Sequence, residues 1–72
     1  MKLSWQKQDD PEREGATVYT ASDAGDVDFT VEENGRGEWS GVGMMGGAVV
    51  YLKTGGLSAE AAQQAIEAWL DA

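Results

Sequence analysis

Carboxylates are the main side chains of this chain that could do chemistry, because the sequence contains no histidine and no cysteine. Without imidazole or thiolate groups, the chain lacks the usual ligands of zinc and haem sites, a disulfide framework, and a Ser-His or Cys-His nucleophile pair. Thirteen Asp and Glu residues stand against five Lys and Arg residues, which gives a formal net charge of -8. The chemistry left to consider is acid–base catalysis by carboxylates, cation binding, or recognition of a basic partner.

The carboxylates Asp26, Asp28 and Glu32 occupy alternate positions in the segment 26–32, with a threonine between the last two. Alternate side chains of a strand share one face, so these groups would point into solvent together. Carboxylates that point into solvent are neither buried nor coupled as a catalytic acid–base pair must be, so we expect no enzymatic activity. Residues 23–28 also lack the sixth-position glycine and twelfth-position glutamate of an EF-hand, and we expect no metal ion and no cofactor.

The segment from Gly41 to Gly46 matches the Gly-x-Gly-x-x-Gly dinucleotide fingerprint letter for letter. That fingerprint works by directing a helix N-terminus at a pyrophosphate inside a βαβ unit. Here the segment leads into the β-prone residues 48–53, and too little chain follows for such a unit. We interpret it as a glycine-rich strand or hairpin.

Recognition of a basic partner is one explanation of the acidic residues around position 30. Residues i and i+2 of a strand lie about 6.6–6.8 Å apart, so a row of carboxylates can imitate successive phosphates of a nucleic acid. The net charge disfavours direct contact with nucleic acid or an anionic membrane. The methionines next to the glycines could add an adaptable apolar contact. The predicted partner-binding residues are Asp26, Asp28, Glu32, Glu33, Glu38, Met44 and Met45.

Each part of this interpretation has a structural alternative. The acidic residues could serve only solubility and protection of strand edges from aggregation. One of the two methionines could instead close an open end of the core.

The segment 26–32 is the clearest strand, and the Asn34-Gly35 pair after it predicts a hairpin whose return strand begins near Trp39. A two-residue turn would place Trp39 on the acidic face. We therefore predict an odd-numbered loop that pairs Val31 with Trp39 on the apolar face.

Further strands are predicted at residues 2–6, 17–21 and 48–53, the last as a central strand because it is short, apolar and bracketed by glycines. The segment 59–70 predicts an amphipathic helix with Ser58 as its N-cap and Glu60 in its first turn. Its apolar stripe includes Ile66, and Glu67 falls on the opposite, solvent side. Its alanine-rich flank at Ala61, Ala65 and Ala68 is expected to approach the sheet closely.

These elements predict a single domain over residues 1–72 with an α+β fold: an antiparallel sheet of four to five short strands, in the order β-β-β-β-β-α, and one C-terminal helix packed on one face. The chain is short enough that only one thin core is expected. The predicted core residues are Leu3, Trp5, Val18, Val27, Phe29, Val31, Trp39, Val50, Leu52, Leu57, Ala62, Ile66, Trp69 and Leu70.

For function, the composition favours a non-enzymatic acidic binding protein that inhibits a larger complex by occupying a basic surface. We also predict that the chain self-associates as a homodimer. In size, acidity and lack of catalytic side chains the chain is similar to many phage-encoded inhibitors, including anti-CRISPR proteins, which implies a phage anti-defence role. The alternative is a small structural or assembly subunit that self-associates through its glycine-rich strand or its methionines. No apolar run suggests a signal peptide or membrane helix, so we expect a cytoplasmic location.

Overall fold

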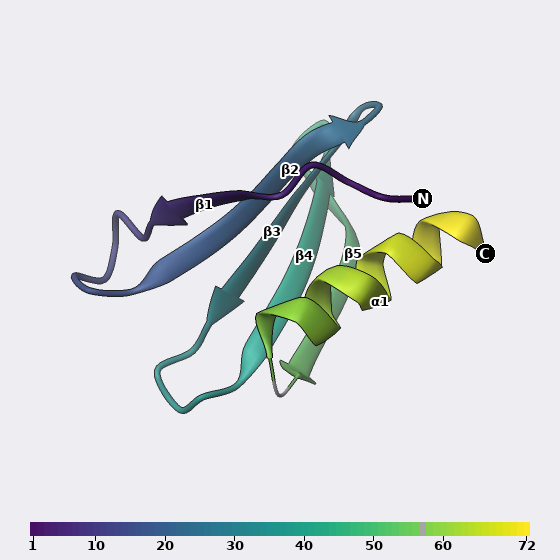
Figure 1. Cartoon of the computed structure of the whole chain (residues 1–72). Coiled ribbons are helices and arrows are strands. Elements are labelled where there is room, and N and C mark those ends of the chain that lie inside the picture. The colour runs from purple at the N-terminus through teal and green to yellow at the C-terminus, as the bar shows by residue number, and fades with distance from the viewer. Residues whose placement is uncertain (57) are drawn as a thin grey trace.

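The computed structural model describes residues 1–56 and 58–72, which form five strands followed by one helix, as predicted (Figure 1). The elements are β1 (Gln6–Asp9), β2 (Thr17–Ala24), β3 (Val27–Glu33), β4 (Trp39–Met45), β5 (Ala48–Gly56) and α1 (Ala59–Asp71). All strand pairs are antiparallel, and the fold is therefore of the predicted α+β class.

Strands adjacent in the chain are adjacent in the sheet, which runs in the order β1-β2-β3-β4-β5. Short turns make this meander possible. Between β4 and β5 only Gly46 and Gly47 intervene, and both have positive φ angles of 58° and 84°, a backbone that glycine adopts without a steric penalty. The predicted strand at 48–53 is thus real but lies at the edge of the sheet, so its predicted central position is wrong.

The helix crosses one face of the sheet in front of β4 and β5, and the N-terminal residues pass over the same face beside it (Figure 1). Between these two layers lies the core, in which Phe29, Val31 and Ile66 are the largest fully buried side chains. We call this side of the sheet the helix face and the opposite side the open face.

Helix α1 begins where the sequence predicts. The backbone N–H of Ala61 donates to Ser58 Oγ at 3.1 Å, and Ser58 has the extended backbone typical of an N-cap. Ala62 and Ile66 are buried against the sheet, as expected from the apolar stripe. A helix of this length is marginal alone, so this contact with the sheet stabilises it.

Two glycines of the fingerprint-like segment serve packing on the helix face. An ideal Cβ added to Gly43 would lie 2.7 Å from Phe29 Cε1, and one added to Gly41 would lie 3.0 Å from Ile66 Cδ1. A third, Gly46, forms the turn. The segment is therefore a strand and a turn, as interpreted from the sequence.

The strand register differs from the prediction. Trp39 pairs with Glu33, and Val31 pairs with Gly41, so the connection is the five-residue loop 34–38 rather than a three-residue one. The loop nevertheless has an odd number of residues, as predicted, so Trp39 and Val31 share the helix face. The predicted pairing of Val31 with Trp39, and the loop length that goes with it, are wrong.

The first strand is also displaced. It covers Gln6–Asp9 instead of residues 2–6, and of the predicted strand only Gln6 belongs to it. Residues 1–5 form no strand because Leu3 turns into the core, where Trp5 packs against the same cluster.

Two predicted core residues are exposed. Leu52 is 64% exposed because its side chain points to the open face, and Trp69 is 43% exposed because only one side of its ring is covered, by Tyr51 and Phe29. Leu57 lies outside the described residues. Val18 and Val50 are buried or partly buried but do not belong to the core cluster, and Val18 lies on the open face, where it pairs with Glu32. The other predicted core residues belong to the cluster or pack against it: Leu3, Trp5, Val27, Phe29, Val31, Trp39, Ala62, Ile66 and Leu70. The prediction missed Ala21 and Ala59, which are small but buried.

Candidate partner-binding surface

The strand register defines the open face as three rows of side chains, because directly paired residues of antiparallel strands point to the same side. One row holds Gln8, Val18, Glu32 and Ser40; the next holds Gln6, Thr20, Thr30, Val42 and Leu52; the third holds Asp28, Met44 and Val49. These rows contain two carboxylates and no base. Both lysines of the paired strand positions, Lys7 and Lys53, lie on the helix face, opposite Tyr19 and Gly41.

Asp28 and Glu32 are exposed on the open face, on either side of Thr30, as the alternation predicts. Within residues 1–56 and 58–72, neither side chain takes part in a hydrogen bond or an ion pair. Asp26 is exposed in the turn before β3. The structure therefore brings two of the three alternating carboxylates onto one strand face and leaves the third at its end.

The other two acidic site residues lie elsewhere. Glu33 pairs with Trp39 and belongs to the helix face, where its backbone carbonyl accepts a hydrogen bond from Arg13 Nη1. Glu38 lies in the loop before β4, and its Oε1 accepts from Asn34 Nδ2 at 2.8 Å. Both residues thus contribute to the hairpin rather than to the open-face carboxylates.

The two methionines also separate. Met44 pairs with Asp28 and with Val49, so it lies on the open face, whereas Met45 is the next residue along the strand and points the other way at the turn. Met45 and Val49 are 45% and 57% exposed. On the open face, Val42, Met44, Val49 and Leu52 form a group of apolar side chains on β4 and β5.

Sequence reasoning missed Val42, Val49 and Leu52 as surface residues. The sequence does contain a signal for Val42. Gly41 and Gly43 alternate with Val42 and Met44, so if the glycines make room for packing on one face of the strand, Val42 and Met44 point to the opposite face. The exposure of Leu52 follows only once β5 is known to be an edge strand, and the order of strands in the sheet shows this.

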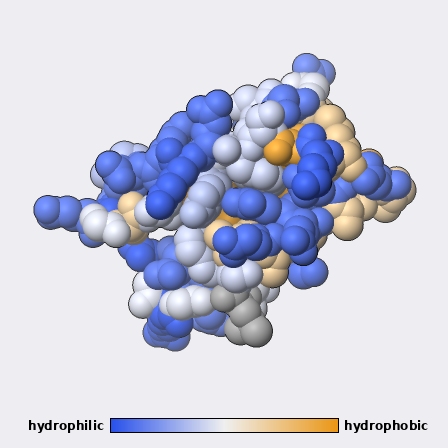
Figure 2. Space-filling view, in the orientation of Figure 1, coloured by the Kyte–Doolittle hydropathy of each residue, from blue (hydrophilic) through white to orange (hydrophobic). Residues whose placement is uncertain are grey.

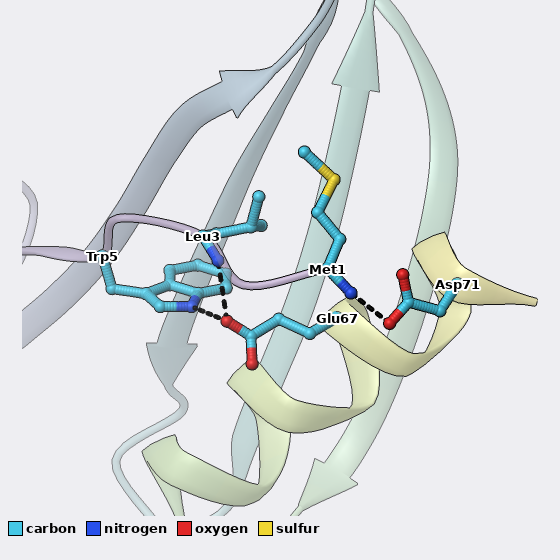
Figure 3. A network of polar contacts seen from close by, with 5 residues as sticks. All are labelled: Met1, Leu3, Trp5, Glu67 and Asp71. Atoms are coloured by element: carbon cyan, nitrogen blue, oxygen red, sulfur yellow. Dashed lines mark hydrogen bonds and ion pairs between the residues drawn. The ribbon is translucent and has the colours of Figure 1, made fainter.

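The helix face holds a polar network that closes the structure (Figure 3). Glu67 Oε2 accepts hydrogen bonds from the backbone N–H of Leu3 at 2.9 Å and from Trp5 Nε1 at 3.2 Å. The N-terminal ammonium of Met1 forms an ion pair with Asp71. The sequence placed Glu67 on the solvent side of the helix, but here it joins the two layers, and these carboxylates have a structural role.

A small apolar pocket of about 110 Å³ also opens on the helix face. Its lining includes Trp39, Tyr51 and Lys53 from the strands and Ala61 and Ala65 from the helix. The alanine flank therefore borders a pocket here instead of closing against the sheet. Burial raises the pKa of the Tyr51 hydroxyl above its usual value of 10.0. The space is well below the roughly 300–1,000 Å³ typical of sites for small molecules.

Seen from the helix side, the surface is mostly hydrophilic, and hydrophobic residues gather mainly toward the right of the view (Figure 2). In the part of the chain that the structure describes, no cluster of three or more acidic side chains is arranged to hold a metal ion. Among the same residues, no helix is long and apolar enough to span a membrane. Comparisons of the chain with models of protein families, with the curated proteins and with the solved structures found no match.

Proposed function

We propose that this protein is a non-enzymatic acidic binding protein that inhibits a larger protein complex by occupying a basic surface of it. The observation that supports this proposal is the exposure of Asp28 and Glu32 on an open face that has no base in its rows. These carboxylates add nothing to packing, and a basic partner would supply the opposite charges that the described residues do not place beside them.

The spacing of these carboxylates favours a nucleic-acid-binding surface as the target. Four residues along a strand separate Asp28 from Glu32, which corresponds to about 13 Å, or roughly two steps of the phosphate-like spacing. Asp26 continues the negative charge into the turn. A phage anti-defence inhibitor, the class that the chain resembles in size and acidity, would act in this way.

Affinity capture from lysate of the native host tests the proposal with three immobilised proteins. These are the wild type, the double variant Asp28→Lys/Glu32→Lys, and the control Glu12→Lys/Glu14→Lys, which makes the same change of charge in the exposed turn between β1 and β2. We expect the wild type and the control to retain the same basic protein or complex and the open-face variant to lose it. The wild type should also reduce binding of nucleic acid by the retained complex, more strongly at low salt.

The opposite result is clear. If the open-face variant retains the same complex as tightly as the wild type at low salt, the carboxylates serve only solubility, and the proposal is wrong.

A second candidate function, a self-associating assembly subunit, is favoured by one observation. Strand β5 is an unpaired edge, and its side chains Val49 and Leu52 are 57% and 64% exposed. Sedimentation at several concentrations tests it, because an apolar self-interface gives a dimer that depends on concentration and little on salt. A monomer at all concentrations in physiological salt would exclude this function.

A further inference from the structure

We propose that the open face binds an amphipathic, basic α-helix of the partner, with the apolar side of that helix on β4 and β5 and its basic side chains over β3. This inference rests on the proposed function and adds to it the kind of element that the partner presents. It is carried by the combination of an apolar and an acidic half on one sheet face.

The apolar half is a compact block. Val42 pairs with Leu52, and Met44 pairs with Val49, so four apolar side chains occupy two neighbouring rows of two strands. Neighbouring strands lie about 4.8 Å apart, which brings these side chains into contact range of one another. Val49 and Leu52 are more than half exposed. A contiguous exposed apolar group of this kind is typical of an interface.

The acidic half lies directly beside this block. Asp28 pairs with Met44, and Glu32 pairs with Ser40, so the carboxylates flank the apolar side chains at both ends of β3. Their separation of about 13 Å is close to two turns of an α-helix, about 11 Å, and the long side chains of lysine and arginine cover the difference. A helix with basic residues two turns apart along one edge of its apolar stripe matches both halves.

The other occupants fit less well. A second copy stacked face to face would bring at least four carboxylates together without a base, because the paired rows of each open face, among the residues that the structure describes, hold two carboxylates and no lysine or arginine. A single extended segment lying on the face would leave its own backbone groups unpaired, whereas a helix satisfies them internally. The helix face shows that this sheet already accommodates a helix on its other side.

Fluorescence anisotropy with two synthetic peptides tests the inference. Both have about 18 residues of leucine, lysine and alanine in the same proportions. In the first, the leucines form one stripe and the lysines flank it two turns apart; in the second, the leucines are spread around the helix. We expect the wild type to bind the first peptide at least about tenfold more tightly than the second.

Protein variants locate the binding. We expect Leu52→Ser to weaken binding of the first peptide about tenfold, and Asp28→Asn/Glu32→Gln to weaken it by a similar factor at low salt but less at high salt. The control Glu12→Gln/Glu14→Gln makes the same change of charge in the exposed turn between β1 and β2 and should leave binding within about twofold.

Each remaining outcome overturns the inference in a distinguishable way. Equal binding of both peptides would mean that charge alone drives association, which contradicts the inference and leaves the proposed function standing. Binding of neither peptide at low salt would contradict both. A concentration-dependent dimer that Leu52→Ser abolishes would identify the occupant as a second copy of this chain.

Discussion

The two faces of the sheet differ in composition although the same strands build both. On the helix face, Phe29 and Val31 pack against Ile66, and glycines give the aromatic rings room. On the open face, the alternate residues of the same strand include Asp28 and Glu32. Neither side chain forms a hydrogen bond or an ion pair with the described residues. Strand alternation thus separates a face that packs against the helix from one on which Asp28 and Glu32 have no described polar partner.

The largest effect should come from removing a large side chain on the helix face. Phe29 is 1% exposed, so we expect Phe29→Ala to lower the free energy of unfolding by about 3–5 kcal/mol. Leu52→Ala, on the open face, should change it by less than about 0.5 kcal/mol because that side chain is already in solvent. Urea denaturation of the two variants measures the difference directly. Similar losses in both would show that the open face also contributes to the core.

A smaller effect should follow from adding one carbon to the helix face. In Gly43→Ala, the new Cβ would lie 2.7 Å from Phe29 Cε1 and 3.1 Å from Tyr51 Cβ, so the ring of Phe29 must move. We expect a loss of about 1–3 kcal/mol in urea denaturation. Ser40→Ala, which changes the open-face side of the same strand, is the control and should have little effect. A neutral Gly43→Ala would mean that the aromatic packing has space to spare.

The smallest effect concerns pH. Because burial raises the pKa of Tyr51, the folded protein favours the neutral phenol, while the unfolded chain ionises near pH 10.0. Below that pH both states hold the proton and this group gives no pH dependence. Above it, the unfolded state releases the proton more readily, so the free energy of unfolding should fall as pH rises. Urea denaturation across this range should show a weaker decline in Tyr51→Phe than in the wild type; an identical decline would contradict the assignment to Tyr51.

Much of this architecture follows from local signals in the sequence. The alternation around Phe29 defines β3 and both of its faces, and Ser58 with the apolar stripe defines α1. Local signals do not show which element, if any, packs against each side chain. Leu52 and Trp69 look like core residues by type, yet one lies on an edge strand's open side and the other has only one side of its ring covered.

The candidate site shows the same limit. Asp28 and Glu32 follow from period-two alternation, but Glu33 is one residue further and therefore faces the other way. Glu38 lies in the loop before β4, where its carboxylate accepts a hydrogen bond from Asn34, and the alternation of β3 does not include it. Glu67 was placed in solvent because the helix pattern alone does not include residues 1–5, whose N–H groups it binds. Contacts between distant parts of the chain decide these cases.

Amide chemical-shift mapping tests most directly whether the open face is the binding face. The isotope-labelled protein would be titrated with the amphipathic lysine-rich peptide at low salt, and every backbone amide followed. The division between the two faces predicts the largest shifts at Thr30, Val42 and Leu52, which share the central row of the open face. Shifts confined to α1 and to the pocket beside Trp39 and Tyr51 would place binding on the helix face and contradict this account.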